Sequence, residues 1–74
     1  MVDQPHFEPE AIAEARRRLR LTQAQLAHVL GCSLAHVKAM EAVTDRPGRR
    51  RIDPAYARLL VAYLDGYRPA DWPA

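Results

Sequence analysis

The sequence predicts a small all-α domain of four helices that ends in a short irregular tail. The hydrophobic fraction of 49% is rich in alanine and leucine, which favour helices. Apolar residues recur three and four positions apart in four stretches, as they do on one face of a helix. Residues typical of helix starts and ends, such as proline, serine, threonine and glycine, flank these stretches.

The length and composition of the chain restrict its class. With 74 residues it forms one domain at most, with a small core. Its single cysteine, Cys32, cannot form an internal disulfide, and no secretory leader is recognisable, so we expect a cytoplasmic location in a bacterial host cell. No apolar run approaches the roughly 20 residues of a membrane helix, so we expect no membrane partner.

Charge is distributed unevenly along the chain. The net charge is +2, but residues 16–51 carry a balance of +7 and the two flanks together carry −5. A basic middle between acidic ends indicates one side that faces a polyanion and one side turned away from it. A solvated, patchy surface without a partner is the open alternative.

The first helix is predicted from Pro9 to about Leu19. Proline suits the first turn, and the acidic residues around it favour the positive end of the helix dipole. Residues 1–7 lack periodicity, so we expect a flexible N-terminal arm in which Phe7 plugs the base of the domain. The apolar face of this helix consists of Ile12, Ala15 and Leu19.

Residues 21–42 predict two short helices joined by a tight turn. Thr22 and Gln25 have the spacing of a capping box, which starts the second helix. Gly31 supplies the left-handed backbone that ends it, and Ser33 caps the third helix. The positions expected to be buried are Leu21, Leu26, Ala27, Leu30, Val37 and Met40.

The fourth helix follows a loop that contains three consecutive arginines. Residues 44–52 are rich in turn-forming residues, and Asp53-Pro54 then supplies a cap and a first helical position. Gly66 ends the helix, and the proline-rich tail is irregular. The expected divisions are an arm at 1–7, a domain at 8–66 and a tail at 67–74. The apolar positions of the fourth helix are Tyr56, Leu59, Leu60, Tyr63 and Leu64.

Two segments carry residues that are shared with known proteins. They are Leu21-Thr22-Gln23, Leu26-Ala27, Leu30-Gly31, Ser33, Val37 and Met40-Glu41 in the first segment, and Gly66 to Ala70 in the second. The first set resembles the lambda-repressor-like, or XRE-type, helix-turn-helix family. The second, Gly-Tyr-Arg-Pro-Ala, is similar to small phage regulators such as the autorepressors associated with anti-CRISPR operons. The resemblance implies a lambda-repressor-like DNA-binding domain and a transcriptional regulator.

The family resemblance implies which residues contact DNA. The third helix would enter the major groove, and the second would contact the backbone. Gln23 and Ser33 are expected at phosphates, Lys38 and His36 at base edges, and an alanine at a thymine methyl group. For Lys38 and His36 a solvated side chain is the open alternative. The expected DNA-contacting residues are Gln23, Ser33, Leu34, Ala35, His36, Lys38, Ala39, Arg46, Arg49, Arg50 and Arg51.

The arginines fall into two groups with different expectations. Those of the loop are expected to hold phosphates or to reach into a minor groove. Of those in the first helix, at least two are expected to be solvated, and some are expected to pair with Glu14. The first-helix group is Arg16, Arg17, Arg18 and Arg20.

We expect a homodimer on a palindromic operator, because one such module makes few base contacts. The predicted interface is the fourth helix with the tail, anchored by Trp72. The alternative is that Trp72 packs on its own domain. The expected interface residues are Tyr56, Tyr63, Tyr67 and Trp72. The expected mechanism is repression by occlusion of a promoter, without a small-molecule effector.

Other chemistries find little support in the sequence. His28, Cys32 and His36 are spaced four apart, but Gly31 and Ser33 interrupt the helix and a fourth ligand is missing, so we expect no metal. No catalytic constellation or cofactor motif is present, so we expect no enzyme. The alternative functions are an antitoxin or adaptor that binds a partner protein, and an excisionase-like protein that bends DNA.

Overall fold

Four helices make up most of the part of the chain that the computed structural model describes, residues 7–42 and 52–73. These ranges contain no strand, so the all-α class is confirmed for them. Arg46, Arg49, Arg50, Arg51 and the arm before Phe7 lie outside the described residues. The helices are α1 (Pro9–Arg18), α2 (Gln23–Leu30), α3 (Leu34–Glu41) and α4 (Pro54–Leu64).

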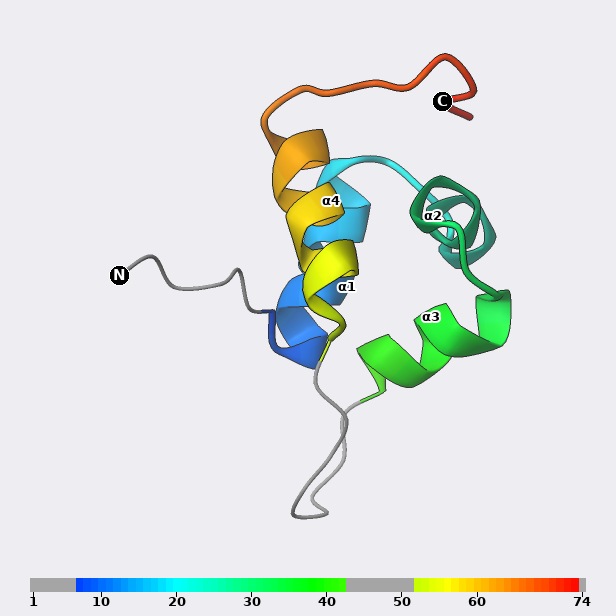
Figure 1. The fold of residues 1–74 in the computed structure, drawn as a ribbon. Coiled ribbons are helices and arrows are strands. Elements are labelled where there is room, and N and C mark those ends of the chain that lie inside the picture. The colour runs from blue at the N-terminus through cyan, green and yellow to red at the C-terminus, as the bar shows by residue number, and fades with distance from the viewer. Residues whose placement is uncertain (1–6, 43–51, 74) are drawn as a thin grey trace.

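The helices are arranged so that α1 contacts both α3 and α4, while α2 packs on α3. In Figure 1, α4 lies along α1, α2 is seen nearly end-on, and α3 runs across the view. Helices α2 and α3 therefore cross at a steep angle. No helix of the described residues is long and apolar enough to cross a membrane.

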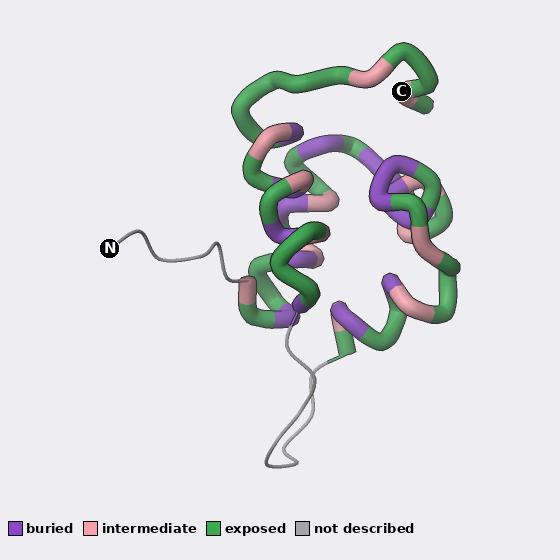
Figure 2. The backbone as a smooth tube through the Cα atoms, viewed as in Figure 1, coloured by how far each residue is buried: buried purple, intermediate pink, exposed green. Residues whose placement is uncertain are grey.

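One hydrophobic core lies between the four helices, as the buried segments in Figure 2 show. Each helix contributes one of the four largest side chains that are less than 2% exposed. These side chains are Ile12, Leu26, Val37 and Leu60. Burying each of them is worth about 2 kcal/mol relative to leaving it in water, so all four helices depend on the same core.

The local signals that start and end α2 and α3 are confirmed. Thr22 and Gln25 form both hydrogen bonds of a capping box, at 3.1 and 2.9 Å. Gly31 has a left-handed φ of 76°, and the Ser33 hydroxyl accepts from the His36 amide. Leu21 is buried as expected.

Arg20 adopts a backbone conformation that the sequence does not signal. Its φ is 61°, a left-handed value that usually belongs to glycine. The next amide, of Leu21, donates to the Arg16 carbonyl at 3.2 Å, which closes the end of α1. The turn directs Leu21 into the core, and the burial of that side chain offsets the backbone strain.

The C-terminal tail packs on its own domain. After Gly66 it runs from the end of α4 toward α2 (Figure 1), where Asp71 meets His28 at 3.0 Å. Trp72 packs edge-on against Tyr63, with ring centroids 5.1 Å apart, and Arg68 lies 4.3 Å above the Trp72 ring. The tail therefore covers the end of the core.

This packing corrects part of the expected dimer interface. Tyr63 is 2% exposed and its hydroxyl donates to the Val29 carbonyl of α2, so it belongs to the core of one chain. Trp72 follows the alternative in which it packs on its own domain. Tyr56 is half-buried, and only Tyr67 of the four aromatic residues is well exposed.

The buried hydroxyl of Tyr63 predicts a pH-dependent stability. Burial, reinforced by the nearby charges of Tyr67 and Asp71, raises the pKa of Tyr63 above its ordinary value of 10.0. As the pH rises, the unfolded chain loses this proton first. The stability linked to the group is therefore full below about pH 10 and is lost as the pH rises through the folded-state pKa.

We expect Tyr63→Phe to lower the free energy of unfolding by about 1–2 kcal/mol at neutral pH, because the Val29 carbonyl loses its donor. The difference in the free energy of unfolding between this variant and the unchanged chain should be smaller at about pH 11 than at neutral pH. Urea unfolding followed by circular dichroism measures both values. Tyr67→Phe, on an exposed ring, is the control and should change little; equal stability of Tyr63→Phe at neutral pH would contradict the role of the hydrogen bond.

Candidate nucleic-acid interface

The exposed face of α3 gathers five of the seven residues that are expected at DNA and that the structure describes. Val37 and Met40 turn into the core, so the positions on the opposite side of the helix face solvent. Leu34, at the start of the helix, is 39% exposed. We call the exposed set of Ser33, Leu34, Ala35, Lys38 and Ala39 the α3 face.

The first turn of α3 is open for a ligand that accepts hydrogen bonds. The Ser33 hydroxyl is engaged by the His36 amide at 3.0 Å. The amides of Leu34 and Ala35 donate to no acceptor within residues 7–42 and 52–73. Together with the positive end of the helix dipole, they favour an anion such as a phosphate oxygen.

His36 is not brought together with Lys38. Its imidazole is half-buried and packs edge-on against Tyr56 of α4, with ring centroids 5.4 Å apart at 65°. This contact holds the ring on the side of α3 that faces α4, away from the α3 face. The expected base-edge position of His36 is therefore not what the structure shows, because a neighbouring helix occupies that side.

Gln23 lies at the start of α2 as expected, but its side chain is engaged. Its Nε2 donates to Glu41 Oε1 at 3.2 Å. Glu41 also receives two bonds from Arg16, Nε to Oε2 at 2.8 Å and Nη2 to Oε1 at 3.2 Å. The amide nitrogen of Gln23 keeps a second hydrogen, which is available to a phosphate.

Arg16, Gln23 and Glu41 form a cluster that we call the clamp. It joins α1, the start of α2 and the end of α3, and Arg16 Nη1 also donates to the Leu21 carbonyl at 3.1 Å. The side chains of Arg16 and Glu41 are only 17% and 7% exposed. Two hydrogen bonds within one ion pair fix the relative orientation of the two side chains as well as their distance. The clamp therefore sets the orientation of α3 relative to α1.

The sequence does not predict the clamp, because Arg16 belongs to a run of arginines of which at least two are expected to be solvated. For Arg17 and Arg18 the expectation holds, since both are exposed and pair with Glu14 at 3.7 and 3.5 Å. The available signal was Glu41, which is one of only two acidic residues between positions 16 and 51. An acidic residue in a strongly basic stretch is expected to pair with one of its arginines.

Lys38 is the cation of the α3 face. It is exposed, and it makes no ion pair with any residue that the structure describes. Apart from Ser33, the other residues of the face are apolar. The lysine is therefore surrounded by methyl groups. The lysine can donate hydrogen bonds to acceptor atoms on the edge of a base, and the methyl groups can contact apolar groups beside that edge.

The other reactive side chains do not converge. Burial raises the pKa of the Cys32 thiol, which disfavours its nucleophilic thiolate form. His28 is engaged by Asp71, and within the described ranges no three His, Cys, Asp or Glu side chains are grouped as for a metal ion.

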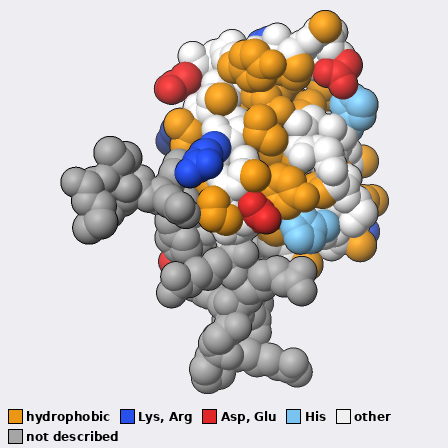
Figure 3. All heavy atoms as spheres, in the orientation of Figure 1, with side chains coloured by type: hydrophobic (Ala, Val, Ile, Leu, Met, Phe, Trp, Pro, Cys, Tyr) orange, Lys and Arg blue, Asp and Glu red, His pale blue; other side chains and the backbone are white. Residues whose placement is uncertain are grey.

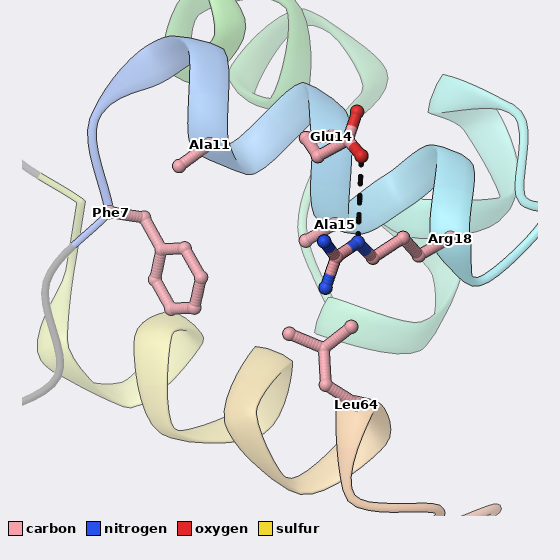
Figure 4. A pocket seen from close by; sticks show the side chains of 6 residues that line it. All are labelled: Phe7, Ala11, Glu14, Ala15, Arg18 and Leu64. Atoms are coloured by element: carbon pink, nitrogen blue, oxygen red, sulfur yellow. Dashed lines mark ion pairs between the residues drawn. The ribbon is translucent and has the colours of Figure 1, made fainter.

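A shallow groove of about 220 Å³ lies between α1 and the end of α4 (Figure 4). Phe7, Ala11, Ala15 and Leu64 give it an apolar lining, so Phe7 packs at the edge of the core as expected. Its two charged side chains, Glu14 and Arg18, pair with each other. The lining therefore offers apolar contact and little unpaired charge.

No protein-family model, curated protein or solved structure matches the chain. A functional surface is therefore inferred from the arrangement of the chain's own side chains. The α3 face is exposed, its first turn is open, and the clamp holds it in place.

We expect Glu41→Gln to lower the free energy of unfolding by about 1–3 kcal/mol, because the change removes the negative partner of the half-buried Arg16 guanidinium. Thermal and urea unfolding measure the loss. Glu14→Gln removes the same charge from a carboxylate whose ion pairs with Arg17 and Arg18 are exposed, and it should cost less than about 0.5 kcal/mol. Equal losses in the two variants would show that the clamp has no special role.

Proposed function

We propose that the protein is a sequence-specific, double-stranded DNA-binding regulator of transcription with a lambda-repressor-like helix-turn-helix. In this proposal α3 enters the major groove and α2 lies against the sugar-phosphate backbone. The observation that carries it is the exposed α3 face, on a helix whose other sides are committed to the core, to α4 and to the clamp. Support also comes from the steep crossing of α2 and α3 around the turn at residues 31–33.

The size of α3 suits this role. A helix with its side chains is about 10–12 Å across, which fits a major groove about 12 Å wide, and the 8 residues of α3 extend only about 12 Å along its axis. A short helix of this kind reaches only a few base pairs. Much of the affinity must then come from phosphates, which the open first turn of α3 and the arginines of residues 46–51 are suited to contact.

The chemistry of the α3 face favours a particular half-site. Lys38 can donate to the O6 and N7 acceptors of guanine. Ala35 and Ala39 present methyl groups, which suit contact with the C5-methyl of thymine. We therefore expect a half-site in which a guanine is flanked by thymines on the strands that face the helix.

The regulatory mechanism we propose is repression by occlusion. A homodimer bound to an inverted repeat over a promoter would block polymerase, as an autorepressor of the phage type controls its own operon. The alternative of an antitoxin or adaptor requires a tail that binds another protein. The tail at residues 67–73 packs on its own domain, which gives that alternative no support.

Selection from a random duplex DNA library tests the function itself. The full chain should enrich an inverted repeat, and the affinity for the enriched duplex should exceed that for random duplex by about a thousandfold or more. Fluorescence anisotropy measures both affinities at the same salt concentration. If no sequence is enriched over the input library, the proposed function is wrong.

Lys38→Ala tests the placement of α3. The variant should lose about 1–3 kcal/mol of discrimination at one base position in each half-site, with little change in binding to random duplex. Competition binding with duplexes substituted at each position measures this loss. Arg17→Ala removes an equal charge from α1 and should leave base preferences unchanged; an unchanged profile for Lys38→Ala would place α3 outside the major groove.

A further inference from the structure

The outer side of α4 is exposed and carries apolar residues. Three of the four large hydrophobic side chains that are exposed in the described ranges lie on α4 or just after it, namely Val61 at 39%, Leu64 at 40% and Tyr67 at 55%. Figure 3, seen from the α4 side, shows hydrophobic side chains spread across this surface with few charged groups among them. A cluster of this kind on a small domain indicates a protein contact.

Two opposite charges lie on either side of Val61 along the helix. Arg58 and Asp65 are seven residues apart, or about two helical turns, so they lie on the same side of α4 with Val61 and Ala62 between them. Both are exposed. Neither side chain forms an ion pair or hydrogen bond within residues 7–42 and 52–73, and about 10 Å of helix separates them.

We propose that a second copy of the chain covers this surface, with the two α4 helices packed antiparallel across a two-fold axis between Val61 and Ala62. In that arrangement Arg58 faces the partner subunit's Asp65, and Asp65 faces the partner subunit's Arg58. The apolar Val61 lies at the centre, and the small Ala62 permits helix axes to approach to about 8 Å. The surface is thus complementary to itself, as a two-fold interface requires.

The charge order selects this arrangement over others. A parallel pairing would bring each charge beside its own copy and would be repulsive at both ends. The interface also differs from the one expected from the sequence, because Val61 replaces Trp72 as the central apolar group. The proposal rests on the proposed function, since an inverted repeat requires a two-fold dimer.

Sedimentation velocity of the full chain without DNA tests the pairing through charge reversal. Arg58→Glu brings two acids together at each end of the interface, and Asp65→Arg brings two arginines together. Each single variant should raise the dimer dissociation constant about tenfold or more. The double variant, and an equal mixture of the two single variants, should both return close to the unchanged chain.

The mixture is the decisive measurement, because in a mixed dimer each substituted residue faces a residue of opposite charge. Circular dichroism checks that the helices are retained, which we expect since both side chains are exposed. Single variants that dimerise like the unchanged chain, a mixture that stays monomeric, or an unchanged chain that is monomeric throughout would each overturn the proposal. A monomer that still selects a DNA sequence would overturn this proposal alone, whereas a dimer without sequence selection would overturn only the proposed function.

Discussion

The ion pair between Arg16 and Glu41 is the contact on which the presentation of α3 depends. It joins residues 25 positions apart, and Gln23 ties the start of α2 to the same carboxylate. The core between the helices is apolar, and apolar burial stabilises close packing without fixing direction. A guanidinium that donates two bonds to one carboxylate does fix direction. The clamp therefore supplies the specificity of orientation, while Leu26, Val37 and their neighbours supply most of the stability.

The fold leaves α3 with one free side. Val37 and Met40 fill the core, His36 packs against Tyr56 of α4, and Glu41 is engaged by α1. What remains is a surface of small and apolar residues around one lysine. A surface of this kind has little hydrogen-bonding capacity, so the proposed DNA binding would depend on phosphate contacts and on a second copy of the chain.

The parts of the fold that depend on neighbours in the sequence were predictable. The Thr22–Gln25 capping box, the left-handed Gly31 and the Ser33 cap each need only a few adjacent residues. The clamp joins side chains far apart in the sequence, and the placement of His36 depends on α4. The contacts of the aromatic residues of α4 and the tail could not be predicted for the same reason. Composition does not reveal that the Tyr63 hydroxyl donates to the Val29 carbonyl of α2, or that Trp72 packs edge-on against the Tyr63 ring.

We propose that the α3 face is the surface that contacts DNA. The most direct test is the amide spectrum of the isotope-labelled chain, recorded with and without a duplex that the chain itself selects. The amide signals of residues 33–39 should shift most, with smaller changes at the start of α2. If the largest shifts fall on α1 or on the exposed side of α4, while residues 33–39 remain unchanged, the DNA-contacting surface has been placed on the wrong side of the molecule.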